Sequence, residues 1–219
     1  MKKIIFIFLC LFVSNQFLCK GQAYKKINGI TRPQIISKKI SKDEYTNLIA
    51  HKIDRKLDSF STIKKTRSRF EFILQNNKSI VLQDKGKEDD LTYRKYRYLS
   101  SLNKTISLFS KDGYENNELF LLNLKNGNRY KLLSTPYINK NGKMFFTFSN
   151  NIEIDYLSNK IELYLICDDN SIINLKSFDY EEAAPVEVFW VAENELAIKI
   201  LNHIDGNERL QYEKWEINF

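Results

Sequence analysis

Residues 118–149 read ELFLLNLKNGNRYKLLSTPYINKNGKMFFTFS, and this stretch decides the fold class that the sequence predicts. Its apolar runs are short, and Lys125-Asn126-Gly127-Asn128 and Asn139-Lys140-Asn141-Gly142 separate them. Asn-Gly pairs suit tight hairpin turns because both residues tolerate a positive φ. Short apolar runs joined by such turns predict an antiparallel β-meander.

The same pattern extends to both sides of this stretch. From residue 68 onward apolar residues recur with a period of two, beginning with Phe70, Phe72 and Leu74, which is the period of a strand with one buried face. The mature chain is therefore predicted to be mainly β, with antiparallel β-meanders. We expect strands at about 79–83, 91–99, 105–110, 119–124, 130–133, 144–149, 160–167, 171–178, 186–191, 195–201 and 210–217.

One α-helix is predicted ahead of the strands. Ser41 and Glu44 have the spacing of a capping box, in which each side chain bonds to the main chain of the other residue. Tyr45, Leu48, Ile49, Ile53 and Leu57 follow at helical spacing, which predicts a helix over 42–58. The expected organisation is a signal peptide at 1–23, a basic lead-in and amphipathic helix at 24–67, and an antiparallel β domain at 68–219.

Residues 118–219 resemble the blades of WD40-like and TolB-like β-propellers. In this resemblance Asn141-Gly142-Lys143 stands where the blade pattern has Asp-Gly-Lys, and 185–196 form the next such element. It implies that Trp190 is the packed aromatic residue of that element. Propellers mostly act as binding platforms, and the resemblance implies no enzyme chemistry by itself.

Chain length limits how many blades are expected. A blade needs about 40–45 residues and a closed ring usually needs at least four blades. Only about 150 residues follow the predicted helix and lead-in. We therefore expect a partial or open propeller-like stack of meanders, with a β-sandwich built from the same hairpins as the alternative.

The N-terminus predicts export. Met1-Lys2-Lys3 precedes an apolar run over 4–13, and Gly21-Gln22-Ala23 places small residues at −3 and −1 of a cleavage site before Tyr24, which is the layout of a secretory signal. The expected location is periplasmic or extracellular, in a bacterium, with no membrane span after cleavage. Lipidation at Cys19 is the alternative, and the bulky Leu18 before it argues against a lipoprotein.

Cysteine and charge add two expectations. Cys167 alone would remain after cleavage, so no internal disulfide is possible, and its apolar strand predicts a buried, inert thiol.

Residues 24–70 carry 13 Lys/Arg and 4 Asp/Glu, residues 71–150 carry 13 and 8, and residues 151–219 carry 5 and 15. We expect the basic 24–70 segment to pack against the acidic 151–219 half; an acidic external partner is the alternative.

The most suggestive candidate site interleaves basic and aromatic residues at 93–98. On a strand, Arg94, Tyr96 and Tyr98 share one face, while the residues between them lie on the other. Such a face could bind a glycan or a peptide, or be an ordinary strand surface with cross-strand pairs. Proteins that bind single-stranded nucleic acid use similar residues, but nucleic acid is not expected as a partner of an exported protein.

Other residue groups give weaker signals. The basic run 64–69 could meet acidic lipid or polymer, and the pairs Asp168-Asp169 and Glu181-Glu182 could hold calcium or act as glycosidase carboxylates. His51 and His203 stand far apart in the sequence, so no catalytic residues, metal site or cofactor are predicted.

The expected function is an exported, non-enzymatic binding or protein-interaction module for an unknown protein, peptide or glycan. A carboxylate-based hydrolase of an extracellular or periplasmic polymer and a structural accessory protein of an envelope complex are the alternatives.

Overall fold

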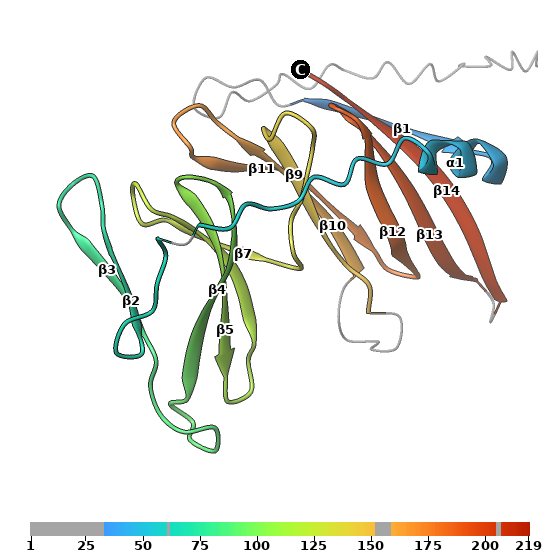
Figure 1. Cartoon of the computed structure of the whole chain (residues 1–219). Helices are drawn as coiled ribbons and strands as arrows, with labels where there is room; N and C mark the ends of the chain where they lie inside the picture. The colour runs from blue at the N-terminus through green and yellow to red at the C-terminus, as the bar shows by residue number, and fades with distance from the viewer. Residues whose placement is uncertain (1–32, 61, 152–158, 205–206) are drawn as a thin grey trace, which may run out of the picture. The chain divides into compact units, whose positions relative to one another are not determined.

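One helix and fourteen strands make up the part of the chain that the structure, a computed structural model, describes: residues 33–60, 62–151, 159–204 and 207–219 (Figure 1). Every strand pair is antiparallel. This confirms the prediction of a mainly β, antiparallel fold with one helix. The predicted signal peptide, Cys19 and the cleavage site before Tyr24 lie outside the described residues.

Three four-stranded sheets form the body of the protein, two of them meanders and the third a three-stranded meander to which the N-terminal strand is added. The first sheet contains β4 (Arg94–Asn103), β5 (Ile106–Gly113), β6 (Glu118–Asn123) and β7 (Arg129–Leu132). The second sheet contains β8 (Tyr137–Ile138), β9 (Met144–Ser149), β10 (Asn159–Ile166) and β11 (Ile172–Tyr180). The third sheet contains β12 (Ala183–Ala192), β13 (Glu195–Ile204), β14 (Asn207–Asn218) and the N-terminal β1 (Gln34–Ile40).

The sheets pack face to face in chain order. Phe146 and Leu163 of the second sheet share a buried core with Trp190 and Trp215 of the third. A separate core joins the first and second sheets. Among the described residues no core joins the first sheet to the third, so the stack is open, as the chain length predicts.

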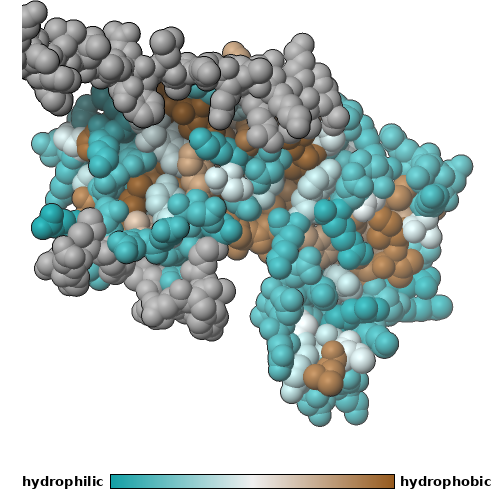
Figure 2. Space-filling model, turned by 180° about the vertical axis from the view of Figure 1, so that it is seen from behind, coloured by the Kyte–Doolittle hydropathy of each residue, from teal (hydrophilic) through white to brown (hydrophobic). Residues whose placement is uncertain are grey.

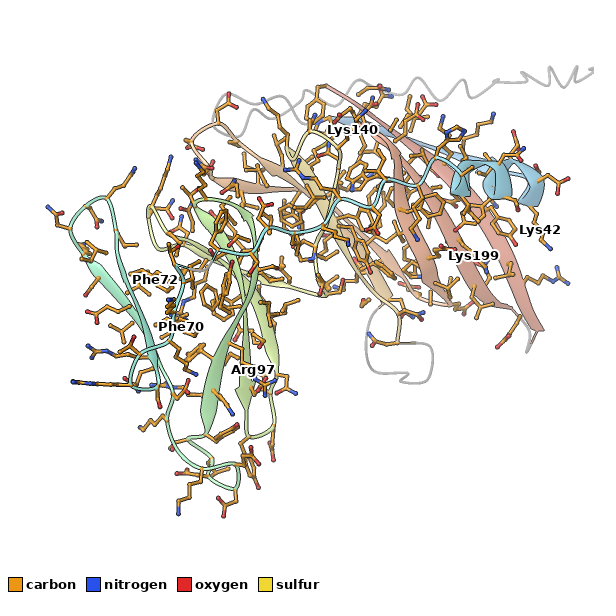
Figure 3. All side chains as sticks on the ribbon, in the orientation of Figure 1. Lys42, Phe70, Phe72, Arg97, Lys140 and Lys199 are labelled. Carbon is orange, nitrogen blue, oxygen red and sulfur yellow. The ribbon has the colours of Figure 1, made fainter. Side chains whose placement is uncertain are left out.

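Another element packs on part of each outer face of the stack. The hairpin β2 (Arg69–Ile73) and β3 (Ser79–Gln83) packs Phe70 and Leu82 onto the first sheet, and Figure 3 shows Phe70 and Phe72 between the hairpin and that sheet. The helix α1 (Lys42–Ile49) packs Tyr45 onto Phe189 of the third sheet. Burying these faces removes apolar surface from water at both ends of the stack.

The N-terminal strand places part of the basic segment on the acidic half. In the β1–β14 ladder Ile40 lies opposite Tyr212, and the Ser37 hydroxyl donates to Glu213 Oε2 at 2.9 Å. Lys52 lies 3.5 Å from the carboxylate of Glu187. The expected contact between the two oppositely charged segments is confirmed for residues 34–53, whereas residues 55–69 contact the first and second sheets instead.

The helix is shorter than predicted. Its capping box is present: the Ser41 hydroxyl accepts from the Glu44 N–H, and Glu44 accepts from the Ser41 N–H. The second of these bonds is the main reason that the pKa of Glu44 is lowered. However, the helix ends at Ile49, so the prediction that it continues through Ile53 and Leu57 was wrong.

A strap, residues 53–58, replaces the rest of the predicted helix. Its main chain meets an edge strand of each sheet in turn, pairing Ile53 with Trp190, Arg55 with Ile138, and Asp58 with Ser101. Figure 1 shows this segment crossing the sheets between α1 and β2. Because Ile53 and Leu57 reach the two inter-sheet cores from the strap, burial and edge hydrogen bonds outweigh the local helical pattern. The strap covers edges that would otherwise expose unpaired peptide groups.

Two local predictions also need correction. Positive φ was expected at both central positions of the Asn-Gly turns. Only the glycines adopt it, with φ of +81° at Gly127 and +77° at Gly142. Cys167 follows the end of β10 and is only partly buried, because the chain leaves the sheet there. The short strand β8 was not predicted.

Candidate functional site

The predicted binding face on β4 is mostly covered. Tyr96 is only 6% exposed and belongs to the core under the β2–β3 hairpin. Tyr98 is partly buried, and its hydroxyl accepts from the Phe60 N–H at 3.0 Å. Arg94 is exposed and donates to the Gln83 carbonyl at 3.2 Å. The three residues share a face, and the β2–β3 hairpin packs on Tyr96 and Tyr98, which favours the interpretation of this face as an ordinary strand surface.

Some of the cations in the basic run 64–69 form contacts within the protein. Lys65 pairs with Asp84 and donates to the Tyr96 carbonyl at 2.7 Å, and Arg69 pairs with Glu71 at 2.9 Å. Arg67 and Ser68 both have positive φ and form a tight turn. The run therefore contributes fewer free cations than its sequence suggests.

The acidic pairs lie on separate turns. Asp169 accepts from the Ser171 hydroxyl and N–H at 2.6 and 2.8 Å, and these bonds lower its pKa. Asp168 pairs with Lys143 at 3.4 Å, and Glu181 and Glu182 precede β12. Within the described ranges, no three His, Cys, Asp or Glu side chains gather as a metal site would require. His51 is exposed after the helix.

The structure reveals a different candidate, the free edge of β14. This strand is twelve residues long, but β1 pairs with it only from Tyr212 to Asn218. On its other side β13 pairs with β14 from Asn207 onward. Within the described part of the chain, residues 207–211 therefore have a neighbouring strand on one side only.

The register shows which peptide groups point toward this free edge. Ile217 donates its N–H to the carbonyl of Asn194 in the β12–β13 turn at 2.9 Å, one residue beyond the Glu195–Glu216 pair at the end of the β13 ladder. Since peptide groups alternate between the two sides of a strand, the odd-numbered residues of β14 bond toward β13. The Arg209 carbonyl accordingly points toward β13, where it accepts from the side-chain amide of Asn202 at 3.4 Å. The N–H and C=O of Leu210 therefore point toward the free edge.

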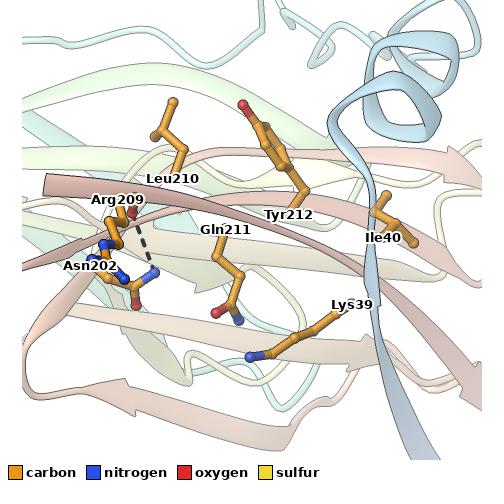
Figure 4. Close-up of a pocket in the computed structure, with 7 residues that line it drawn as sticks. All are labelled: Lys39, Ile40, Asn202, Arg209, Leu210, Gln211 and Tyr212. Carbon is orange, nitrogen blue, oxygen red and sulfur yellow. Dashed lines mark hydrogen bonds between the residues drawn. The ribbon is translucent and has the colours of Figure 1, made fainter. Parts of the chain in front are cut away.

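A groove of about 330 Å³ lies beside this edge. Figure 4 shows its lining, with Ile40 and Lys39 on β1 and the other residues on β13 and β14. The side chains that line the groove are those of Lys39, Ile40, Asn202, Arg209, Leu210, Gln211 and Tyr212.

The two sides of the groove differ in chemistry. Leu210 and Tyr212 point to one side of β14 in Figure 4, and Gln211 points to the other. Leu210 is 49% exposed, and Tyr212 is partly buried against the helix. By the alternation of strand side chains, Arg209 shares the side of Gln211. One side is therefore apolar, and the other is polar and cationic.

A hydrogen-bond network fixes the inner end of the polar side. Glu213 accepts from the Ser37 hydroxyl, the Gln211 amide and the Trp215 indole N–H at 2.9, 2.5 and 2.8 Å. Lys39 lies opposite Glu213 in the ladder. Because three donors already satisfy this carboxylate, it is a fixed wall of the groove rather than a free acid.

Sequence reasoning missed this groove. The alternation of polar and apolar residues over 209–212 marks a strand, but it carries no information on where β1 stops. That end is set by Ser41, which begins the helix and leads the chain away from β14.

Comparison with known proteins gives no match: no family model fits the chain, and no curated protein or solved structure is significantly similar to it. The likeness of 118–219 to propeller blades therefore rests on the hairpin motifs. No helix within the described ranges is long and apolar enough to cross a membrane.

Proposed function

We propose that this protein is an exported, non-enzymatic interaction module that takes up an extended segment of a partner protein or peptide at the free edge of β14. The observation that carries the proposal is the difference in length between β1 and β14, which leaves the Leu210 peptide group on an open edge. An added strand would bond to that edge, which is a common mode of peptide recognition.

The lining of the groove defines the chemistry of the segment. Side chains of an added strand alternate between its two sides. On one side they meet Leu210, Ile40 and Tyr212, which favour apolar residues; on the other they meet Lys39 and Arg209, which favour carboxylates. The segment that fits best is alternately apolar and acidic.

The alternative of a structural accessory protein predicts one large exposed apolar patch. Figure 2 shows hydrophobic patches interspersed with hydrophilic residues on the face seen from behind. The most exposed large apolar side chains, Leu91 at 82% and Ile73 at 78%, come from different elements. This distribution favours a local binding site.

Strand addition is tested with a fluorescent peptide of alternating valine and glutamate and a matched peptide of valine and lysine. We expect the acidic peptide to bind and Leu210→Pro to weaken that binding about fivefold, because proline removes the N–H on the free edge and each hydrogen bond contributes about 1 kcal/mol. The β13 ladder does not use that N–H, so the variant should stay folded.

Two further variants complete the test. Leu210→Ala keeps the N–H and should lose less affinity than the proline variant. The double variant Lys39→Glu, Arg209→Glu should prefer the lysine peptide. Equal binding by wild type and Leu210→Pro would contradict strand addition, and failure of the acidic peptide to bind the wild type would remove this edge as the site.

Export is tested separately, because it concerns residues outside those described. Mass spectrometry of the protein from its native host should show a mature N-terminus at or near Tyr24. An intact Met1 in a cytosolic fraction would refute export, and a lipid-modified Cys19 would mean that the protein is membrane-anchored.

A further inference from the structure

The chain itself contains segments of the kind that the β14 groove favours. Two stretches of the sequence alternate two apolar with two acidic residues: 152–155, which reads IEID, and 178–181, which reads FDYE. Each has the order of side chains that fits a groove with one apolar and one cationic side. A second copy of the chain is therefore a candidate for the partner.

The stretch 178–181 is already used by the fold. The Phe178 ring packs on Trp215 with ring centroids 4.0 Å apart, and Asp179 pairs with Lys160 at 2.9 Å. Tyr180 is partly buried against the core between the second and third sheets. Because these side chains already make contacts in and around β11, this stretch does not fit the role of a donated strand.

The other stretch, 152–155, lies outside the described residues, but the residues that flank it are described. Ser149 lies opposite Lys160 at the end of the β9–β10 ladder. The Asn151 N–H donates to the side-chain oxygen of Asn159 at 2.6 Å. Both ends of the segment therefore start from one point on the second sheet, whereas the groove is formed by the third sheet.

The length of the stretch suits the free edge of β14. Four extended residues span about 13 Å at a rise of about 3.3 Å per residue. The free edge comprises the five residues 207–211, which is slightly longer. One stretch of this length therefore fits along the edge without reaching β1.

The side chains of the stretch match the two sides of the groove. On an added strand Ile152 and Ile154 share one side, and the two carboxylates share the other. Figure 4 shows Leu210 and Tyr212 on one side of β14, where the isoleucines fit. The carboxylates fit the side of Lys39 and Arg209.

The cations of the groove are available for such carboxylates. Lys39 and Arg209 are both exposed. Neither of them forms an ion pair with another described residue. The charge of the groove is thus left for a partner.

We propose that residues 152–155 of a second copy of this chain occupy the β14 groove. The proposal rests on the function proposed above, since it names the partner of the same groove. The donated stretch follows β9 and the accepting edge belongs to β14, so the two contacting surfaces differ and the contact is head to tail. Copies can then add one after another.

A fluorescent peptide with the sequence of residues 151–156 tests the donated stretch. We expect it to bind the wild-type protein saturably and to compete with the valine–glutamate peptide. If the valine–glutamate peptide binds and this peptide does not, the groove stands and the second copy is not its partner. If neither peptide binds, the groove itself is lost, and this proposal with it.

Sedimentation velocity of the full chain tests association between copies. A stretch of four residues covers a small interface, so the association should be weak. We expect the average mass to rise with protein concentration. A mass that stays that of one chain at every concentration up to about 1 mM would overturn the proposal.

Charge reversal identifies the two contacting surfaces. The groove is reversed by Lys39→Glu with Arg209→Glu, and the donated stretch by Glu153→Lys with Asp155→Lys. Each pair of substitutions should weaken association at least fivefold, the equivalent of about 1 kcal/mol for two exposed ion pairs.

The two reversals combined in one chain make opposite charges meet again. Association should therefore return toward that of the wild type, which a nonspecific effect of either pair would not produce. Unchanged association in both reversed variants, or no recovery in the combined variant, would overturn the proposal.

Discussion

Replacing Trp190 by alanine should lower the free energy of unfolding by about 3–5 kcal/mol, the usual range for truncating a buried large aromatic side chain. Trp190 is 1% exposed and lies in the core between the second and third sheets, where its ring is 5.8 Å from that of Phe146. Its indole N–H donates to the Tyr137 carbonyl at 2.8 Å. The substitution leaves a cavity and an unpaired carbonyl together.

The Trp190 prediction can be checked by urea unfolding of wild type and variant. The loss should be accompanied by little change in the slope of the transition, because the folded architecture is retained. Trp190→Phe keeps most of the ring but loses the N–H, so it should cost clearly less than Trp190→Ala. A transition midpoint in Trp190→Ala equal to that of wild type would show that the core does not depend on this residue.

Replacing Asn139 by aspartate should destabilise the protein by about 3 kcal/mol or more, because it places an unpaired charge in a buried site. Asn139 is fully buried. Its amide donates to the Glu193 carbonyl at 2.7 Å, and its Oδ1 accepts from the Met144 N–H at 3.0 Å. The bond from Asn139 to Glu193 joins the second sheet to the third. Aspartate keeps the bond from Met144 but places a carboxylate oxygen against the Glu193 carbonyl, so this link between the sheets is lost.

Asn126→Asp is the matched control for Asn139→Asp. Asn126 is exposed in the corresponding turn of the first sheet. Among the described residues its side chain makes one hydrogen bond, in which Oδ1 accepts from the Asn128 N–H at 2.9 Å. Aspartate can make the same bond there, so the control variant should unfold at nearly the wild-type denaturant concentration. If both variants lost the same stability, the bond between sheets would not be the cause.

Local sequence patterns were sufficient for the strands and for the start of the helix. The period-two alternation and the turns around Gly127 and Gly142 placed most strands, because the alternation depends only on neighbouring residues and one buried face. The capping box of Ser41 and Glu44 was predicted for the same reason: its two hydrogen bonds span three residues. The burial of Trp190 followed from the apolar strand around it.

Distant contacts decided the rest. Ile53 and Leu57 fit a helix locally, but the strap forms because the edges of three sheets, made by residues far along the chain, offer hydrogen bonds and cores. Tyr96 fits an exposed strand face, but the β2–β3 hairpin covers it.

The proposed β14 groove is also a tertiary feature. The β14 groove exists because β1 stops at Ile40 against a strand more than 170 residues away, as the separation of 176 between Ser37 and Glu213 illustrates. The sequence by itself determined which segments are strands and where they turn, since those depend on local periodicity. Only the tertiary structure decided which edges and polar groups remain unpaired, because pairing is a property of distant segments brought together.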